Sequence, residues 1–197
     1  ATPYHKWYVA KQDARGKLVG EVMKRTFELQ PDDKLVKYNL EPVTHGTKEL
    51  PHAYTNGFHT ADGTVYSNGS PRISLYGNKK DLVVRFTGYR SITTDSHNRL
   101  NVNYSSEVLQ DKFFVPSSEY SVESRLQWLA GLFDGDGTLT NNNGTESIQL
   151  VSTNKPFLLE LQLLLQELGV DAKISLMSEA SYRKLPANDK TSKLKDY

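Results

Sequence analysis

Apolar and polar residues alternate over short stretches near the start of the chain. Residues 4–10 and 18–22 are rich in β-branched and aromatic side chains, and the turn-forming segment 13–16 separates them. Further along, longer apolar runs with helical spacing take over. We therefore expect a β-rich segment over residues 1–46 and a mixed α/β (α+β) domain over residues 47–197.

Two later stretches carry apolar residues at the spacing of a helix. One follows Ser121, a residue type that favours the N-cap position. The other, residues 157–168, follows Asn154 and Pro156 and stops at Gly169, which are signals for the start and the end of a helix. Both stretches are expected to be helices, and the Leu-rich second one is expected to pack in the core.

An internal repeat organises the larger domain. Residues 57–64 align with residues 131–138, 74 positions later, and in each copy a strand pair and an apolar helical stretch follow. This pattern predicts two related helix-strand units in tandem. The first covers residues 47–118 and the second covers residues 119–197.

Each copy of the repeat ends its first helix with an aspartate and a glycine. Gly63 follows Asp62 and Gly137 follows Asp136, and we expect both glycines to end their helices in the left-handed conformation. A carboxylate is disfavoured at a helix C-terminus because that end already carries partial negative charge. Two such carboxylates at equivalent positions predict a divalent cation nearby.

Small residues on both helices would allow the two backbones to approach closely and bring the aspartates together. These residues are Gly57, Ala61, Ala130, Gly131 and Gly135. Paired carboxylates suit Mg²⁺ or Mn²⁺ better than Zn²⁺. The chemistry that such a site supports is metal-assisted hydrolysis of a phosphodiester.

Alternation along the predicted strands separates an apolar face from a polar face. Ile73 and Leu75 are expected to face the helices, which leaves their polar neighbours outward. Arginine, asparagine and glutamine are among the residue types that read base edges in DNA. The candidates for DNA contact are Arg72, Ser74, Arg90, Arg99, Asn101, Asn103, Gln149 and Lys173.

The second copy of the repeat resembles a known motif. Residues 128–137 look like the second motif of the LAGLIDADG homing endonucleases, and residues 54–63 look like a looser first motif, in which His59 and Thr60 replace an apolar-acidic pair. The resemblance implies a pseudo-twofold endonuclease whose saddle-shaped sheet holds duplex DNA. It also implies a monomer with internal pseudo-symmetry that cuts both strands at a specific site. By comparison with that family, the second half, residues 119–197, is expected to be incomplete at its C-terminal end.

The same resemblance implies a set of active-site residues. The last acid of each motif binds the catalytic metal ions in that family, often with the carbonyl of the preceding residue. The segment 111–116 resembles the intervening block, whose lysine supports catalysis. The residues that these roles map onto are Asp62, Asp136, Ala61, Gly135 and Lys112.

The N-terminal segment carries a second resemblance. Residues 1–9 look like the Thr-x-x-His block of inteins, and residues 17–42 look like strands that follow it in the Hint splicing domain. This implies that Thr2 and His5 polarise a scissile peptide bond. The whole looks like the middle of an intein with an inserted endonuclease, of the ribonucleotide reductase group. The absent first and closing blocks are expected on a complementary fragment or beyond this segment, next to the flanking extein.

Composition narrows the class of protein only slightly. Lys and Arg total 24 and Asp and Glu total 23, so the net charge of +1 predicts no partner, and residues 47–197 are not basic overall. There is no cysteine, which excludes disulfides and thiolate metal sites. No stretch is apolar enough to span a bilayer, and the first residues lack the core of a signal peptide. A soluble, intracellular (cytoplasmic) protein without membrane contact is expected.

Simpler interpretations stay open beside these. An Asp-Gly pair is a common turn, Lys112 could be an ordinary solvated lysine, and Asp134 is expected to be a surface or supporting acid. The remaining histidines, His59 among them, show no ligand spacing and are expected to be ordinary polar residues. The alternatives for function are a catalytically silent module that binds nucleic acid, a scaffold for the splicing domain, and a structural α/β protein.

Overall fold

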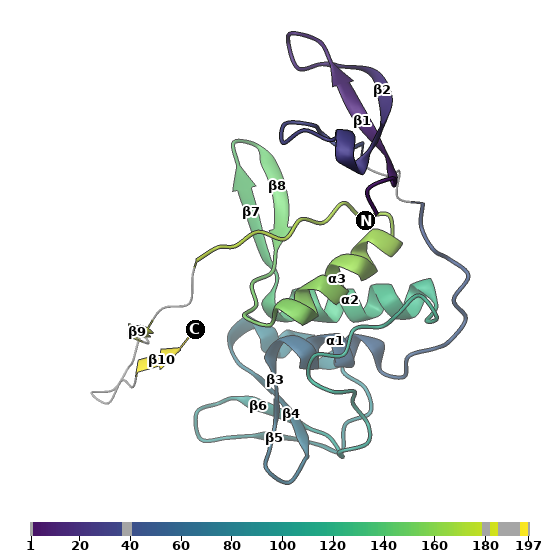
Figure 1. Ribbon diagram of the computed structural model, residues 1–197. Helices are drawn as coiled ribbons and strands as arrows, with labels where there is room; N and C mark the ends of the chain where they lie inside the picture. The colour runs from purple at the N-terminus through teal and green to yellow at the C-terminus, as the bar shows by residue number, and fades with distance from the viewer. Residues whose placement is uncertain (1, 37–40, 179–181, 185–193, 197) are drawn as a thin grey trace. The chain divides into compact units, whose positions relative to one another are not determined.

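A computed structural model describes residues 2–36, 41–178, 182–184 and 194–196. The chain divides into two compact units, Ala1–Asn39 and Leu40–Tyr197. The fold is mixed α/β with antiparallel sheets (Figure 1). The assignment of residues 1–46 and 47–197 to two functional domains stays a prediction.

The first unit is a β-hairpin with a short extension. Its elements are β1 (Lys6–Gln12), β2 (Leu18–Arg25) and the 3₁₀ turn η1 (Thr26–Glu28). The strands are antiparallel, with Lys6 opposite Arg25. Val9 is buried and also bridges Leu35, which adds a further extended segment beside β1. The strands predicted from the alternating pattern are confirmed.

The second unit holds the two helices that carry the aspartates. Its elements are α1 (Ala53–Asp62), β3 (Gly63–Val65), β4 (Pro71–Leu75), the 3₁₀ segment η2 (Gly77–Arg85), β5 (Ser91–Thr94), β6 (Leu100–Asn103), α2 (Val122–Asp136), β7 (Thr138–Asn142), β8 (Thr145–Gln149), α3 (Lys155–Glu167), β9 (Tyr182–Lys184) and β10 (Leu194–Asp196). The predicted caps are confirmed: the side chains of Ser121 and Asn154 accept hydrogen bonds from the backbone N–H groups of Ser124 and Phe157.

α1 and α2 lie side by side with their backbones nearly in contact (Figure 1). A Cβ atom on Gly57 would lie 1.8 Å from the carbonyl oxygen of Trp128, and one on Gly131 would lie 1.9 Å from that of Tyr54. The two contacts are reciprocal, since Tyr54 and Gly57 precede Trp128 and Gly131 by the same 74 positions. The close packing predicted from the small residues is confirmed.

A core forms on each side of this helix pair. On the α1 side lies a four-stranded antiparallel sheet of order β3-β4-β6-β5, whose residues Ile73, Leu75 and Val102 are fully buried with Phe58. On the α2 side lies α3, and the core there is built from Trp128, Leu132, Phe157, Leu161 and Leu164 with their neighbours. The prediction that α3 belongs to the core is confirmed, as is the inward orientation of Ile73 and Leu75.

The two glycines after the aspartates do not adopt the left-handed conformation that we predicted. Gly63 has φ −74° and Gly137 has φ −69°, so each helix runs directly into an extended strand. Glycine is needed at these positions because there is no room for a side chain, and not because of the backbone torsion. A Cβ on Gly63 would lie 2.1 Å from the ring of His59. A Cβ on Gly137 would similarly lie 2.5 Å from the carbonyl oxygen of Phe133.

The hairpin of β7 and β8 differs from its counterpart in the first half of the unit. Leu139 stands opposite Ile148 in the hairpin, and these side chains are 69% and 60% exposed. In the first half, Ile73 aligns with Ile148, here 75 positions later, and is fully buried. The difference follows from the neighbours, because β4 pairs with β3 and β6, whereas β8 pairs only with β7 among the described strands.

Candidate active site at the paired helix ends

The two predicted metal-binding acids lie at the adjoining ends of the two packed helices. Asp62 is the last residue of α1 and Asp136 is the last residue of α2. One residue earlier, the helices touch: a Cβ on Gly135 would lie 2.3 Å from the Cβ of Ala61. The small residues therefore determine the geometry of the site, since bulkier ones would hold the two carboxylates apart.

Lys112 lies at the same place. Its Nζ donates hydrogen bonds to the carbonyl oxygens of His59 (2.9 Å), Ala61 (2.8 Å) and Gly63 (2.7 Å). These three acceptors use all three N–H bonds of an ammonium group. Partial burial lowers the pKa of Lys112, while the charges of Asp136 and Asp62 oppose that shift. Lys112 thus caps the C-terminal end of α1, where cations are favoured by the helix dipole.

A second lysine reaches the site, and the sequence analysis did not identify it. Lys79, the third residue of η2, forms an ion pair with the carboxylate of Asp62 and donates a hydrogen bond to the carbonyl oxygen of Gly135 at 2.7 Å. It therefore links the acid of one helix to the backbone of the other. Nothing in the spacing of the repeat singles out Lys79.

The electrostatics of the site indicate that the two acids influence each other. Partial desolvation and the negative charge of Asp62 raise the pKa of Asp136. The positive charges of Lys79 and Lys112 act in the opposite direction and reduce that rise. Two carboxylates and two ammonium groups thus form one coupled cluster at the helix ends.

The donor atoms fit a hard divalent cation. Asp62 and Asp136 supply carboxylate oxygens, and Ala61 and Gly135 supply carbonyl oxygens, which are the ligands that Mg²⁺ and Ca²⁺ prefer. Ammonium groups contact three of these four residues in the structure. This cluster of oxygen atoms therefore favours positive charge. Within the described residues there is no group of three or more His, Cys, Asp or Glu side chains placed to hold a metal.

His59 lies beneath these groups and is not the ordinary polar residue that we expected. It is 1% exposed, and neither ring nitrogen has a hydrogen-bond partner in the part of the chain that the structure describes. Burial, with a smaller contribution from the charge of Lys112, lowers the pKa of His59 to about 4. The imidazole is therefore neutral at pH 7.

Asp134 stands apart from the site, as expected for a surface or supporting acid. Its Oδ2 accepts hydrogen bonds from the hydroxyl of Tyr54 (2.8 Å) and from Arg85 (2.7 Å). Arg85 also lies over the Tyr54 ring, 4.1 Å from its centroid. Burial and the charge of Asp134 raise the pKa of Tyr54. These contacts tie α1 to α2 and to the end of η2.

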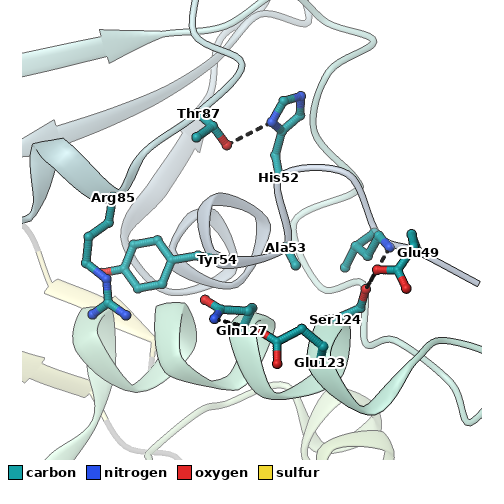
Figure 2. A pocket seen from close by; sticks show the side chains of 10 residues that line it. Glu49, His52, Ala53, Tyr54, Arg85, Thr87, Glu123, Ser124 and Gln127 are labelled. Atoms are coloured by element: carbon teal, nitrogen blue, oxygen red, sulfur yellow. Dashed lines mark hydrogen bonds between the residues drawn. The ribbon is translucent and has the colours of Figure 1, made fainter.

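A pocket of about 310 Å³ lies at the other ends of the two helices (Figure 2). Tyr54 and Arg85 line it together with His52, at the start of α1, and with Glu123 and Gln127, in the first turns of α2. Because Asp62 and Asp136 are at the C-terminal ends, the pocket is separate from the carboxylate cluster.

Half of the predicted DNA-contacting residues share one face of the four-stranded sheet. Arg72 stands opposite Asn103 and Ser74 stands opposite Asn101 across β4 and β6. Arg72 donates hydrogen bonds to Asn103 and to the hydroxyl of Tyr66, both at 2.7 Å, and its guanidinium lies over the Tyr66 ring. Asn101 is only 6% exposed and accepts a hydrogen bond from Ser74. Arg72 thus offers free donors, whereas Asn101 does not.

The other candidates lie elsewhere. Arg90 precedes β5, and Arg99 precedes β6 and pairs with Asp95 across a turn. Gln149 ends β8 in the separate hairpin, and Lys173 is exposed beyond α3. The DNA-binding roles of all eight residues stay predictions.

The candidate splicing residues belong to the first unit. His5 donates a backbone hydrogen bond to the carbonyl oxygen of Thr2 at 3.1 Å, and both side chains are exposed. This turn directly precedes β1, which starts at Lys6. The splicing roles of Thr2 and His5 also stay predictions.

Similarity to known proteins covers both parts of the chain. It is 34% identical over 197 residues to the ribonucleoside-diphosphate reductase large subunit of Invertebrate iridescent virus 6, with 94% of this chain and 20% of that protein covered. It is 27% identical over 232 residues to the ribonucleoside-diphosphate reductase NrdEB subunit alpha of Bacillus subtilis (strain 168), with 98% and 21% covered. The chain thus spans about a fifth of the length of the curated relatives it matches.

No solved structure matches the chain. In the described part of the structure, every helix is too short or too polar to cross a membrane. Residues 123–194 match the family model described as a LAGLIDADG-like domain, and this range includes nearly all of α2 with its terminal Asp136. The chain therefore contains a LAGLIDADG-like domain.

Proposed function

We propose that residues 47–197 form a site-specific homing endonuclease that cuts both strands of duplex DNA with Mg²⁺ or Mn²⁺. The observation that carries this proposal is the meeting of the two helix ends, where Lys79 joins the carboxylate of Asp62 to the carbonyl oxygen of Gly135. An arrangement of oxygens that attracts positive charge beside two coupled acids supports metal-dependent phosphodiester hydrolysis. The LAGLIDADG-like domain supports the same reaction class.

Each group at the site has a proposed part in the reaction. Asp62, Asp136 and the carbonyls of Ala61 and Gly135 would hold the cations, which supply charge stabilisation for the phosphate and an activated water when bound. Lys112 keeps the end of α1 in place by binding three carbonyl oxygens. The polar face around Arg72 would bind the duplex, with its backbone contacts giving affinity and its base contacts giving specificity.

The reciprocal contacts of Gly57 and Gly131 support a pseudo-twofold relation between the two halves. Such a relation suits a duplex, whose two backbones are also related by local twofold symmetry. One aspartate from each half would then serve the two strands. Because both halves are in one chain, the proposed functional form is a monomer. Its proposed location is the cytoplasm.

A cleavage assay tests this function. The purified chain is incubated with a plasmid that carries the coding sequence of a ribonucleotide reductase large subunit without the inserted segment. With Mg²⁺ we expect linear plasmid cut at a single position, and with excess chelator we expect none. Binding without cutting in Mg²⁺ and in Mn²⁺ would favour the silent module, and neither binding nor cutting would favour a scaffold.

We further propose that residues 1–46 belong to the Hint domain of an intein. The observation that favours this is the extent of the similarity, since nearly all of this chain matches about a fifth of much longer ribonucleotide reductase subunits. Such a ratio is expected for an element inserted in a host protein. Thr2 and His5 would then act at the upstream splice junction, together with segments outside this chain.

Substitution of His5 tests the splicing role. In the full reading frame with host sequence on both sides, His5→Ala should impair N-terminal cleavage and splicing, because proton transfer at the junction needs an imidazole near neutral pH. DNA cleavage should persist, because His5 is in the other compact unit from both nuclease acids. The control is His97→Ala at an exposed turn. Undiminished splicing in His5→Ala would remove His5 from the mechanism.

A further inference from the structure

Lys79 takes up the same two acceptors that the proposed function assigns to a divalent cation. Its ammonium pairs with the Asp62 carboxylate and donates to the carbonyl oxygen of Gly135 at 2.7 Å. An ammonium nitrogen and a metal ion cannot both occupy the space between these two oxygens. The lysine and the metal therefore compete for one position.

We propose that Lys79 is a displaceable internal cation that occupies the metal position beside Asp62 and sets the metal concentration at which the site fills. This inference rests on the proposed metal-dependent function and adds a regulatory residue to it. Without metal, Lys79 compensates the charge of Asp62 and keeps the helix ends together. When a divalent ion binds, the ammonium leaves these two oxygens and turns toward solvent.

The surroundings of Lys79 allow this movement. Its side chain is 34% exposed, and only two of its three N–H bonds are used by these acceptors. Lysine has a flexible four-carbon stem, so it can release an acceptor without moving the backbone. Lys112 is different, because three carbonyl oxygens around its ammonium hold it at the end of α1.

Among the described residues, a competing lysine is present at only one of the two acids. Asp62 is paired with Lys79, but among the described residues Asp136 forms no ion pair. Beyond the motif the two copies of the repeat align 75 positions apart, so Asn154 corresponds to Lys79. The side chain of Asn154 caps α3 instead. The two halves are therefore not equivalent toward cations, although their acids align.

Metal titration of matched variants of the full chain tests the proposal. Lys79→Met removes the competing ammonium, and Lys80→Met removes the same charge from the adjacent lysine, which forms no ion pair in the described part of the chain. Mn²⁺ affinity is measured by calorimetry, and the thermal midpoint is measured in chelator and in Mn²⁺. Lys79→Gln provides a second neutral variant if the methionine variant does not fold.

The expected result is that Kd for Mn²⁺ falls about fivefold in Lys79→Met and stays near the wild-type value in Lys80→Met, because a partly exposed ion pair opposes binding only modestly. The rise in thermal midpoint on adding Mn²⁺ should be larger in Lys79→Met. If the wild type binds Mn²⁺ and Lys79→Met binds it equally well or more weakly, the proposed role of Lys79 is overturned. The metal-dependent function would not be affected by that result. Absence of Mn²⁺ binding to every protein would overturn both this proposal and the metal-dependent function.

Discussion

The ammonium group of Lys112 donates a hydrogen bond to the carbonyl oxygen of Ala61 at 2.8 Å. Ala61 was predicted to bind metal through its carbonyl oxygen and Lys112 was predicted to support catalysis, and their direct contact limits how the lysine acts. With His59 and Gly63 as its other acceptors, Lys112 has no N–H bond left for a substrate. We infer that Lys112 acts by positioning the end of α1, and with it the carboxylate of Asp62.

Lys112→Met should therefore lower both stability and cleavage. Three backbone carbonyls would lose their partner at the end of α1, at a cost of about 2 kcal/mol in the free energy of unfolding. Urea denaturation measures this loss, with Lys80→Met as the control for removal of a charge. Unchanged stability together with lost cleavage would show instead that Lys112 acts directly in the reaction.

Gly131→Ala should destabilise the protein through the contact of the two helices. The added methyl group would lie 1.9 Å from the carbonyl oxygen of Tyr54, so the helix backbones must move apart. We expect a loss of about 3 kcal/mol, because such overpacking outweighs the roughly 1 kcal/mol gain in helix propensity. Gln127→Ala, at an exposed position of the same helix, is the control. A variant as stable as the wild type would contradict the observed packing.

The elements that were predicted correctly are those whose caps, spacing and residue types agree with the packing around them in the folded chain. The caps at Ser121 and Asn154, the packed glycines and the inward Ile73 all follow from spacing and residue type. The left-handed ends at Gly63 and Gly137 were wrong, because a C-terminal glycine can be required by space as well as by torsion. Here Gly63 begins β3 and Gly137 directly precedes β7, and each glycine lies against the last turn of its helix.

The candidate site could be predicted only in part. Asp62 and Asp136 are marked by the repeat, which places equivalent residues at the ends of two packed helices. No sequence pattern identifies Lys79 or His59, because what sets them apart is their tertiary contacts with segments distant in sequence. A lysine pair after a strand usually remains solvated, and a helix histidine is usually partly exposed. Only the packed structure distinguishes these two residues from ordinary ones.

The burial of His59 predicts a loss of stability in mild acid. Its pKa is about 4 in the folded chain and near 6.5 when unfolded, so the unfolded state takes up the proton first as the pH falls. The contribution of neutral His59 to the free energy of unfolding is fully present above pH 6.5. About 3 kcal/mol of it is lost as the pH falls toward 4. His59→Leu should lose less stability between pH 7 and pH 4 than the wild type, whereas His97→Gln should follow the wild type. Parallel pH profiles for all three proteins would refute this origin.

Arg72 is expected to read a base rather than only a phosphate. Two hydrogen bonds and the Tyr66 ring fix the plane of its guanidinium, which leaves donors at its outer end. Arg72→Ala should weaken binding to the target duplex by about 1–3 kcal/mol and change binding to unrelated duplexes far less. Fluorescence anisotropy with both duplexes measures this, with Arg15→Ala in the first unit as the control. An equal loss on both duplexes would indicate a phosphate contact.

Binding of any duplex should also weaken steeply with salt. Although the net charge of the chain is only +1, contacts from one face to phosphates release counterions whatever charge the other faces carry. Titration of the target duplex at several salt concentrations gives the slope of log K against log salt. A binding constant independent of salt would contradict a phosphate-contacting face.

The central claim is that Asp62 and Asp136 form one metal-dependent site for double-strand cleavage. Asp62→Asn and Asp136→Asn each remove a charge and a good cation ligand with little change in shape. The decisive measurement is cleavage of the target plasmid in Mg²⁺ by both variants, alongside duplex binding by the same preparations. We predict that each variant binds with nearly wild-type affinity and produces no linear plasmid. Cleavage at the wild-type rate by either variant would contradict the account.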